Sequence, residues 1–412
     1  MKTSHKLLID KFIGNPIAYL LNFVVRFIGF FLRIDHSLDK PFKTIAISKY
    51  LGMGSIIQAT PLIQTLKANY PDAKIIFITD NSNRVLLQHI SSIDEILTVN
   101  DKNIFTLFGS IFKLLFHLWK NRPDVFINLE IYSTISSLIT TFSLSTNRFG
   151  FFKSDKKYRL GLYTHMMYFN QKSPISEVYL QFARLLKCKN IVLSLDKIEL
   201  NEEEKKNSEL YFHQQNIEKN KYIVVNPNAS DLRIERRWPA ENFIHLLKKM
   251  SEEFQDYKLV LIGSKGEADF VHSISSTIKI EKVIDTAGKL SLVNLIHLIK
   301  NAALLVTNDT GPMHIGFSQG TNTVAMFGPC SPDQYGKSEN AHLIYKNVYC
   351  SPCVHEFFIP PCKGNNQCMK LITVDEVWKE IKKALENKSS TKSGPEGIIY
   401  ESNITLGQVL RL

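Results

Sequence analysis

The chain has 412 residues, of which 44% are hydrophobic and 22% charged, so it is long enough for two globular domains with hydrophobic cores. Its formal net charge is +11, but the basic residues are scattered, apart from runs at 153–159 and 233–237. Neither run lies beside an aromatic cluster or a predicted recognition helix, which argues against nucleic-acid binding. We therefore expect this charge to meet an anionic membrane surface or phosphorylated substrates.

The N-terminal segment, residues 1–35, contains the apolar stretch PIAYLLNFVVRFIGFFL at 16–32, which only Asn22 and Arg26 interrupt. A spanning helix needs about 20 apolar residues, and an arginine in mid-span is costly. An amphipathic helix lying on the inner leaflet therefore fits better, and the alternative is a helix packed on the protein's own core. No secretory signal with a cleavage site is visible, so we expect a cytoplasmic protein peripheral on the inner membrane.

Strand–helix alternation begins after this segment, with strands predicted at 44–48, 74–79, 95–99, 125–128 and 147–151. The loop after the first strand contains Gly52, Gly54 and Ser55. Glycines between a strand and a helix allow a ligand to approach the backbone closely. This loop is therefore a candidate binding loop.

Glu130 follows the fourth predicted strand and should stand at the same carboxyl edge as Ser55. It is a candidate proton acceptor, and the alternative is a carboxylate favoured by the dipole of a helix start. Arg148 and the basic run 153–159 are expected further along this edge. There they would meet an acidic acceptor or be solvated.

A charged segment at 201–221 precedes a new strand at 222–225, and we place the boundary between domains 36–210 and 211–386 here. The new strand leads to Asn228 and Ser230, and then to Arg236 and Arg237 before Trp238-Pro239. Arginines at the carboxyl end of a strand can bind a diphosphate through paired donors. The alternative is an exposed charged loop. A further strand at 258–262 ends in Gly263, and Glu267 beyond it could bond ribose hydroxyls.

The stretch 303–329, ALLVTNDTGPMHIGFSQGTNTVAMFGP, predicts a strand, a turn, a helix and a second strand. The turn residues Asp309, Thr310 and Gly311 lie where the helix begins, and His314 lies in its first turns. Free N–H groups at a helix start attract phosphate, so these residues would surround a phosphate site. Taken singly, Asp309 is explained as a helix cap and His314 as a surface histidine.

Four of the six cysteines lie within 19 residues, in the spacing C-x2-C-x8-C-x5-C: Cys350, Cys353, Cys362 and Cys368. Such a set could hold a structural zinc, and the competing interpretations are reduced thiols or two disulfides. A reducing cytoplasm disfavours the disulfides, and we do not expect a metal. The tail, residues 387–412, is polar and is predicted to be disordered.

The motif DTGPMH after a buried strand, closed by Phe327-Gly328-Pro329, and the earlier RRWP together resemble glycosyltransferase family 9, which includes bacterial lipopolysaccharide heptosyltransferases. The resemblance extends from about Lys43 to Leu385 and is strongest in the C-terminal half. It implies the α/β GT-B fold: two doubly wound Rossmann-like domains facing across a cleft. The N-terminal domain would bind the acceptor and the C-terminal domain the nucleotide sugar.

The resemblance also implies a reaction: an inverting transfer of a heptose-like sugar from a nucleotide-diphosphate donor such as ADP-heptose to a lipopolysaccharide core or related glycan. No cofactor or catalytic metal is implied. The donor-binding residues would be Asn228, Ser230, Arg236, Arg237, Gly263, Glu267, Thr310, Gly311 and His314. Asp309 would bind or orient the sugar, and the acceptor would meet Gly52, Gly54 and Arg148.

One position departs from the family pattern. Many members carry Gly-Asp in the first loop, where the aspartate is the catalytic base, but this chain has Gly54-Ser55. A serine hydroxyl is too weak a base to replace a carboxylate. We therefore expect Glu130 to be the base and Ser55 to orient the acceptor. The alternative is a non-catalytic nucleotide-sugar-binding protein that has lost its base; an epimerase acting on a nucleotide sugar is disfavoured by the two motifs.

Overall fold

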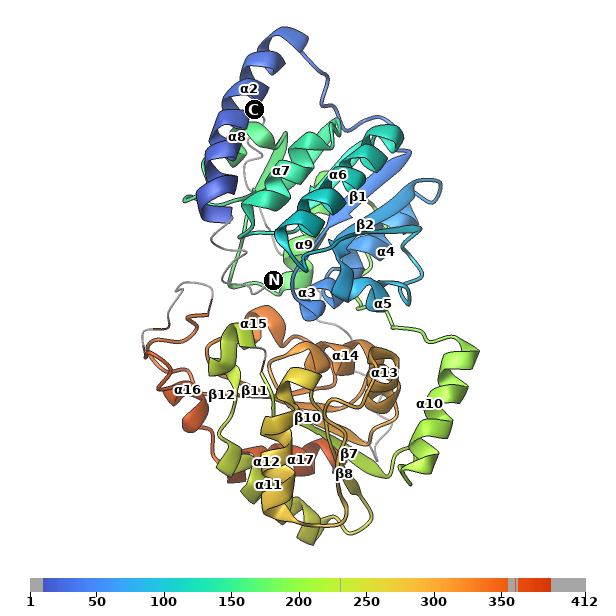
Figure 1. Cartoon of the computed structure of the whole chain (residues 1–412), viewed down its shortest axis with the longest axis vertical. Helices are drawn as coiled ribbons and strands as arrows, with labels where there is room; N and C mark the ends of the chain where they lie inside the picture. The colour runs from blue at the N-terminus through green and yellow to red at the C-terminus, as the bar shows by residue number, and fades with distance from the viewer. Residues whose placement is uncertain (1–9, 230, 355–359, 361, 387–412) are drawn as a thin grey trace. The chain divides into compact units, whose positions relative to one another are not determined.

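The computed structural model describes residues 10–229, 231–354, 360 and 362–386, and these form two compact units (Figure 1). Residues 10–171 and 175–196 belong to the first unit, and residues 172–174 and 197–386 to the second. Each unit contains one six-stranded sheet, and every pairing in both sheets is parallel. The predicted α/β fold of two doubly wound units is confirmed. The predicted disordered tail, residues 387–412, lies outside the described residues.

The first sheet has the order β3-β2-β1-β4-β5-β6, which is the Rossmann order. Its strands are β1 (Thr44–Ser48), β2 (Lys74–Asp80), β3 (Glu95–Val99), β4 (Val125–Asn128), β5 (Asn147–Phe152) and β6 (His165–Tyr168). Its helices are α2 (Asn15–Leu32), α3 (Met53–Ile57), α4 (Thr60–Asn69), α5 (Arg84–Leu87), α6 (Ile104–Asn121), α7 (Thr134–Phe142), α8 (Arg159–Leu162) and α9 (Ile175–Leu185).

The second sheet repeats this order, as β12-β11-β10-β7-β8-β9. Its strands are β7 (Tyr222–Asn226), β8 (Lys258–Leu261), β9 (Val283–Asp285), β10 (Leu304–Asn308), β11 (Thr323–Phe327) and β12 (Ala341–Tyr345). Its helices are α10 (Glu202–Gln214), α11 (Ala240–Glu253), α12 (Ala268–Ile278), α13 (Leu292–Lys300), α14 (Gly311–Gln319), α15 (Pro332–Tyr335), α16 (Gln367–Lys370) and α17 (Val374–Glu386).

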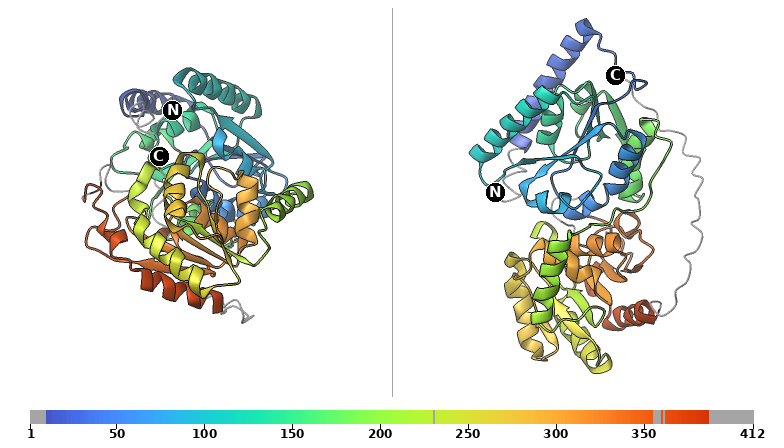
Figure 2. Two further views of the ribbon diagram at one scale, coloured as in Figure 1. Left: turned by 60° about the horizontal axis from the view of Figure 1, so that its bottom comes forward. Right: turned by 90° about the vertical axis from the view of Figure 1, so that its right-hand side faces the viewer.

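The central strands are buried because helices cover both faces of each sheet (Figure 2), as in most parallel sheets. In β7 and β10 every residue is buried, which agrees with their apolar sequences YIVVN and LLVTN. Trp238 is fully buried in the core of the second unit, and its Nε1 donates to the carbonyl of Ile372 (2.9 Å). The RRWP segment is therefore anchored at its tryptophan.

Helix α10 belongs to the second unit, because it packs on α13, where the hydroxyl of Ser208 donates to Asn294 Oδ1 (2.9 Å). The sequence-based boundary after residue 210 divides this helix. In the structure the boundary between the two units lies earlier, between Asp196 and Lys197.

Helix α2 packs on the first unit through one face only. Ala18, Leu21 and Val25 contact a small cluster that includes Tyr158 and Leu162. The opposite face is exposed, and by length and composition Phe12–Leu32 is the one segment of the described chain that could cross a membrane. The sequence left two interpretations of this segment open, and in the structure the helix packs on the unit and also presents an apolar outer surface.

Asp10, in the π-helical turn Asp10–Gly14 before α2, ties this segment to α7. Its two carboxylate oxygens accept from the backbone N–H groups of Thr134 (2.6 Å) and Ile135 (2.8 Å), the first residues of α7. A side-chain oxygen in this position satisfies N–H groups that a helix leaves unpaired at its start. The described turn Asp10–Gly14 and helix α2 are thus part of the unit's fold.

We predict that Asp10→Ala lowers the free energy of unfolding of the first unit by about 1–2 kcal/mol, since it removes a helix cap. Trp119 is the one tryptophan of this unit, so its fluorescence during urea unfolding reports the loss. Asp72→Ala, at an exposed position, is the matched control and should change stability by less than about 0.5 kcal/mol. An Asp10→Ala protein with the wild-type midpoint would contradict this role.

Candidate functional site

Side-chain hydrogen bonds join the carboxyl ends of β7 and β10. Asn226 Nδ2 donates to the hydroxyls of Thr307 (2.9 Å) and Thr310 (2.8 Å). Asn308 Nδ2 donates to the carbonyl of Asn228 (3.0 Å). All of these residues except Thr310 are buried. The network therefore fixes the loop after β7 and the start of α14 relative to each other.

Asn228 is buried at this edge, and one of its two side-chain polar atoms is unpaired among the described residues. Its Nδ2 donates to the carbonyl of Ile262 (2.7 Å), which fixes the orientation of the amide. Its Oδ1 is buried and has no hydrogen-bond partner among the described residues. Gly263 lies against the same amide, and a Cβ there would come within 2.8 Å of Nδ2. An unpaired buried acceptor is costly, so this atom marks a place for a ligand donor.

Arg236 and Asp309 form an ion pair beside the network. Arg236 Nε lies 3.5 Å from Asp309 Oδ2, and Nη1 donates to the Asp309 carbonyl (3.4 Å). The carboxylate is almost fully buried, whereas the Arg236 side chain is 22% exposed. A guanidinium held on one side and open on the other can still bind an anion.

Cys330 completes this cluster, and the sequence analysis missed it. The thiol is fully buried next to Asp309 and Arg236, and burial raises its pKa, so it is a neutral neighbour of the ion pair. Its position directly after Phe327-Gly328-Pro329, at the carboxyl end of β11, is the signal that could have identified it.

His314 lies in the first turns of α14, 4% exposed, with its ring near those of Phe317 and Tyr335. Burial lowers its pKa, the charge of Asp309 partly opposes this and that of Arg236 adds to it, and the pKa that results is about 4. The imidazole is therefore neutral at pH 7.

Arg237 lies in a different environment from Arg236. Its guanidinium carbon lies 3.9 Å from the centroid of the Phe270 ring on α12, and Nη2 donates to the Ala229 carbonyl (3.4 Å). The two arginines expected to act together are therefore separated. Arg236 pairs with Asp309, and Arg237 stacks on an aromatic ring.

The start of α14 is open. Thr310 is the N-cap residue, but its side chain makes no capping hydrogen bond, because the hydroxyl accepts from Asn226 and donates to the Asn308 carbonyl (3.3 Å). The amide of Gly311 thus begins the helix without a side-chain cap. Glu267, by contrast, is used locally, since its carboxylate accepts from the Ser264 N–H (2.8 Å) in a capping box. Ser230 lies outside the described residues.

In the first unit, Glu130 holds the loop after β1. Its Oε1 accepts from the N–H groups of Tyr50 (2.8 Å) and Leu51 (3.0 Å) and lies 3.0 Å from Lys49 Nζ. The side chain is almost fully buried, and none of these three contacts uses Oε2. Glu130 therefore lies at the carboxyl edge beside the candidate binding loop, as expected.

Gly52 and Gly54 shape this loop. Gly52 has a φ of 87°, a conformation that side chains rarely adopt, and it precedes α3, in which Gly54 is buried. Ser55 is half-buried on α3 and hydrogen-bonds to Tyr179 of α9. Burial and the charge of Glu130 raise the pKa of Tyr179, so its neutral phenol is a neighbour of both candidate residues. The apolar surroundings of Tyr179 on α9 gave no sequence signal for this role.

Arg148 does not lie at this edge. It is the second residue of β5 and pairs in register with Phe126, and its guanidinium donates to the carbonyls of Leu162 (2.7 Å) and Ser145 (2.9 Å). The expected position was wrong, because the short β5 starts at Asn147 and places Arg148 near its amino end. The Arg148 side chain is engaged in structural hydrogen bonds.

Arg159, in the basic run 153–159, is fully buried. Its guanidinium donates to the carbonyls of Glu130 (3.3 Å), Ser133 (3.1 Å) and Phe151 (3.1 Å). It therefore fixes the backbone that carries Glu130, and it is neither solvated nor open to an acceptor.

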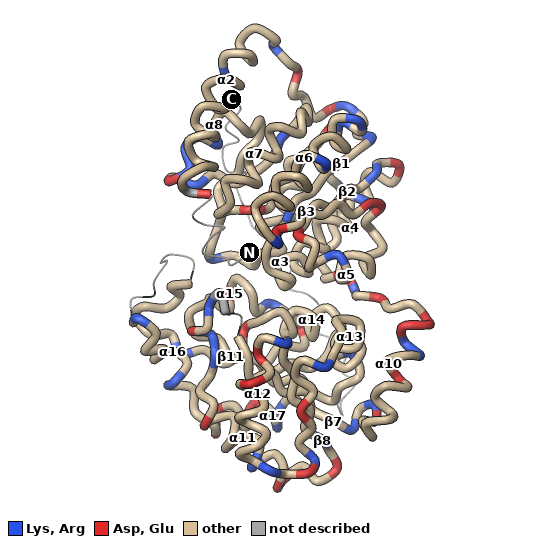
Figure 3. Tube along the Cα trace, viewed as in Figure 1, with Lys and Arg blue, Asp and Glu red and all other residues tan. Residues whose placement is uncertain are grey.

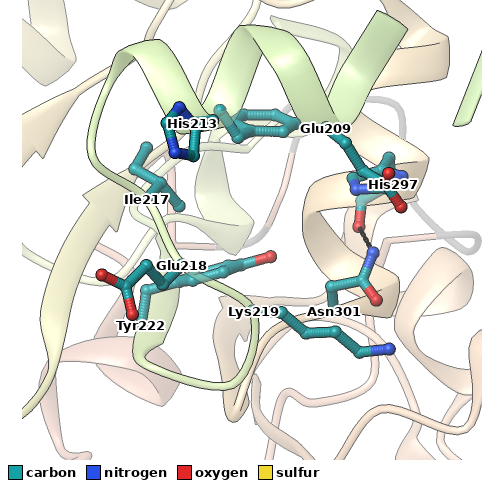
Figure 4. A pocket seen from close by; sticks show the side chains of 9 residues that line it. Glu209, His213, Ile217, Glu218, Lys219, Tyr222, His297 and Asn301 are labelled. Atoms are coloured by element: carbon teal, nitrogen blue, oxygen red, sulfur yellow. Dashed lines mark hydrogen bonds between the residues drawn. The ribbon is translucent and has the colours of Figure 1, made fainter. Parts of the chain in front are cut away.

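A pocket of about 280 Å³ lies between α10 and α13, at the amino end of β7 (Figure 4). Its lining includes Glu209, His213, Tyr222, His297 and Asn301. None of the site residues predicted from the sequence lines it. It lies at the edge of the sheet opposite to the Asn226 network, because Tyr222 is the first residue of β7.

The cysteines of the C-terminal loop are free thiols in the structure. Burial raises the pKa of Cys368 to about 11, and Cys353, Cys362 and Cys350 contribute to the increase. The described part of the chain contains no group of three or more His, Cys, Asp or Glu side chains arranged to hold a metal ion.

The pKa of His314 gives a test of its burial. Between pH 6.5 and 4 the unfolded state binds a proton that the folded state excludes, so the free energy of unfolding decreases as the pH falls. We predict that His314→Gln reduces this pH slope by up to about 1.4 kcal/mol per pH unit. Urea unfolding between pH 4.5 and 7, followed by the second unit's tryptophans, measures the slope. The exposed His245→Gln is the control, and an unchanged slope in His314→Gln would contradict the assignment.

Comparison with known proteins identifies the family of the chain. A sequence profile of glycosyltransferase family 9 (heptosyltransferase) matches residues 111–359. Lipooligosaccharide heptosyltransferase 2 of Campylobacter jejuni is 25% identical over 344 residues, covering 81% of this chain and 96% of that protein. Lipopolysaccharide heptosyltransferase 2 of Escherichia coli K12 is 32% identical over 101 residues, 24% of this chain and 28% of that protein.

Solved structures agree in fold. A family 9 glycosyl transferase from Veillonella parvula has a TM-score of 0.72 at 22% identity, covering 85% of this chain and all of that one. The E. coli ADP-heptose lipopolysaccharide heptosyltransferase II has a TM-score of 0.68 at 23% identity, covering 84% of this chain and all of that one. The fold is thus that of the GT-B glycosyltransferases. The family profile matches more than half of the chain. The chain therefore belongs to glycosyltransferase family 9 and is a glycosyltransferase.

Proposed function

We propose that the protein transfers a heptose from a nucleotide-diphosphate donor, ADP-heptose, to a lipopolysaccharide core or related glycan, with inversion at the anomeric carbon. The names of the curated relatives support the heptose and the acceptor. The E. coli heptosyltransferase WaaC, of similar fold, has been solved with ADP and with ADP-2-deoxy-2-fluoro heptose. The observation that carries the proposal is the convergence of Arg236, the spare Asn228 Oδ1 and the open start of α14 at one edge of the second sheet.

The donor diphosphate binds at this edge. Arg236 offers charged N–H groups, and the Gly311 amide at the start of α14 adds a donor at the positive end of the helix dipole, whereas Pro312 has no N–H. Asn228 Oδ1 accepts a hydrogen bond from the nucleoside or sugar, close to Gly263. Asp309 orients Arg236 through their ion pair. These groups stabilise the charge that builds on the departing diphosphate, so no catalytic metal is part of the proposal.

In the reaction the acceptor hydroxyl oxygen bonds to the anomeric carbon while the bond from that carbon to the diphosphate oxygen breaks. A single displacement of this kind inverts the anomeric centre. Glu130 takes the hydroxyl proton through Oε2, while Lys49 and two backbone amides hold Oε1. Ser55, oriented by Tyr179, positions the acceptor. The geometry of Glu130 thus matches a base with a fixed orientation.

The transfer assay tests this function directly. Purified protein is incubated with ADP-heptose, other nucleotide sugars and a deacylated core acceptor. We expect ADP release equal to the glycosylated acceptor formed, with the inverted anomeric configuration by NMR. Serine at position 55 is the feature that favours a non-catalytic binding protein, and family membership favours an enzyme. Donor binding without product from any donor would support the binding protein.

We also propose that the protein is peripheral on the cytoplasmic side of the inner membrane. The apolar outer face of α2, with residues 59% to 75% exposed, supports this: Leu20, Phe23, Phe27, Phe30 and Phe31. A helix with such a face can lie in the bilayer interface. This position brings the enzyme to a lipid-linked acceptor.

We predict that Arg236→Ala weakens ADP binding by about 1.5–3 kcal/mol, the contribution of a charge-assisted hydrogen bond. Arg237→Ala should have a smaller effect, since that side chain stacks on Phe270. Isothermal titration calorimetry measures both, with the exposed Lys221→Ala as the charge-matched control. Equal ADP affinity in Arg236→Ala and wild type would exclude Arg236 from the donor site.

We predict that Glu130→Gln lowers kcat by about 10²–10⁴-fold while ADP affinity stays unchanged, because it removes a general base. The glutamine oxygen can still accept from the Tyr50 and Leu51 amides, so the loop keeps these hydrogen bonds. Ser55→Ala should lower kcat by a smaller factor. Steady-state kinetics of the wild type and of both variants measures these changes in kcat.

Lys49→Gln separates this role from loop positioning, since it breaks the ion pair and keeps the carboxylate. If Glu130 only positions the loop, Lys49→Gln and Glu130→Gln lose similar activity. That result would end the assignment of Glu130 as the base.

A further inference from the structure

Helix α6 carries an aromatic stripe on its outer surface. The stripe consists of Phe105, Phe108, Phe112, Phe116 and Trp119, whose exposed fractions lie between 38% and 86%. Spacings of three and four residues place all five side chains on one side of the helix. The opposite side is buried through Leu107, Leu114 and Leu118. The aromatic stripe is therefore additional to the face that α6 needs for the core.

The aromatic stripe lies on the same side of the first unit as the apolar face of α2. Helices α6, α7 and α8 follow strands that succeed one another in one direction across the sheet, so they cover one face of it. Both α2 and α6 pack on α7, and Figures 1 and 2 show the three helices along this face. Trp119 Nε1 donates to the Phe142 carbonyl at the end of α7 (2.6 Å), which joins the aromatic stripe to this layer.

The charged residues on and near α2 and α6 indicate which kind of partner binds this surface. Neither α2 nor α6 contains an aspartate or glutamate, and exposed Arg26, Arg33, Lys113 and Lys120 lie on or next to them (Figure 3). Phenylalanine and tryptophan side chains next to basic residues fit the interface of an anionic bilayer, where apolar rings enter the acyl region and cations meet the headgroups.

The contacts of α2 favour lying on the bilayer over crossing it. Its inner face is held by Ala18, Leu21 and Val25, and Asn22 Nδ2 donates to the Tyr158 carbonyl. A spanning orientation would break these contacts and expose Tyr158 and Leu162. Since α6 projects from the same layer, a bilayer that contacts the outer face of α2 also reaches the aromatic stripe.

We propose that the aromatic stripe of α6 is a second membrane-docking element, which inserts into the same anionic leaflet as the outer face of α2. Two helices then fix the orientation of the first unit on the membrane, which one helix would leave free to rotate about its axis. The proposal does not depend on the identity of the transferred sugar.

Trp119 allows a test without substitution, because Trp238 and Trp378, the other two tryptophans, are buried in the second unit. The full chain is mixed with vesicles of phosphatidylcholine and 30% phosphatidylglycerol that carry bromine on the acyl chains. We expect bromine to quench the Trp119 fluorescence, and vesicles without phosphatidylglycerol to quench it much less. Cosedimentation with the anionic vesicles without quenching would overturn the proposal, since α2 alone would then bind.

A variant gives the second measurement. Phe108→Ser/Phe112→Ser/Phe116→Ser changes only exposed side chains, and we expect it to lower the vesicle partition coefficient at least tenfold while α2 is intact. Leu193→Ser/Leu210→Ser, also at exposed positions, is the control and should bind as wild type does. Unchanged binding of the triple variant would overturn the proposal. The proposal would also be overturned if the wild-type protein were a dimer in vesicle-free buffer and the triple variant a monomer, because the stripe would then join two copies. If the triple variant does not fold, the quenching experiment decides.

Discussion

The second unit depends on the buried hydrogen bonds of Asn226. This one amide joins Thr307 on β10 to Thr310 at the start of α14, and it does so from the end of β7. Because the Thr310 hydroxyl is engaged there, it does not cap α14, and the helix start stays open. Asn308 extends the network by accepting from the Trp238 N–H (3.2 Å), which fixes the segment that carries Arg236. The proposed site for an anionic diphosphate is thus built from polar side chains that bond to one another, apart from the unpaired Asn228 Oδ1.

In the first unit, hydrogen bonds from and to charged side chains hold the loop after β1 and the backbone of Glu130. Arg159 holds the carbonyl of Glu130, and the Glu130 carboxylate in turn holds the loop after β1. Under the proposed role of Glu130 as the base, serine is tolerated at position 55 because another carboxylate is already fixed next to the loop. A buried ion pair such as Lys49–Glu130 is costly unless its hydrogen bonds are complete, and here two backbone amides complete them.

Much of the fold was predictable from the sequence, because central parallel strands are continuous apolar runs between turn residues. The strands β6, β9 and β12 were missed, since they are short edge strands that are only partly buried. The structure brings the candidate residues Asn228, Arg236 and Asp309 together, as expected from strand ends that meet at one edge of a parallel sheet. Side-chain direction was not predictable: adjacent Arg236 and Arg237 diverge, Arg148 bonds to nearby carbonyls, and the pKa of His314 depends on burial that a sequence pattern does not reveal.

The central claim is that the donor nucleotide binds at the carboxyl edge of β7 and β10. Hydrogen–deuterium exchange of the full chain with and without saturating ADP tests it most directly, because it reports every peptide at once. We expect protection of peptides covering 226–237 and 309–316, with no change around α10 and the start of β7, where the pocket of Figure 4 lies. Protection confined to the peptides that line that pocket would contradict the account.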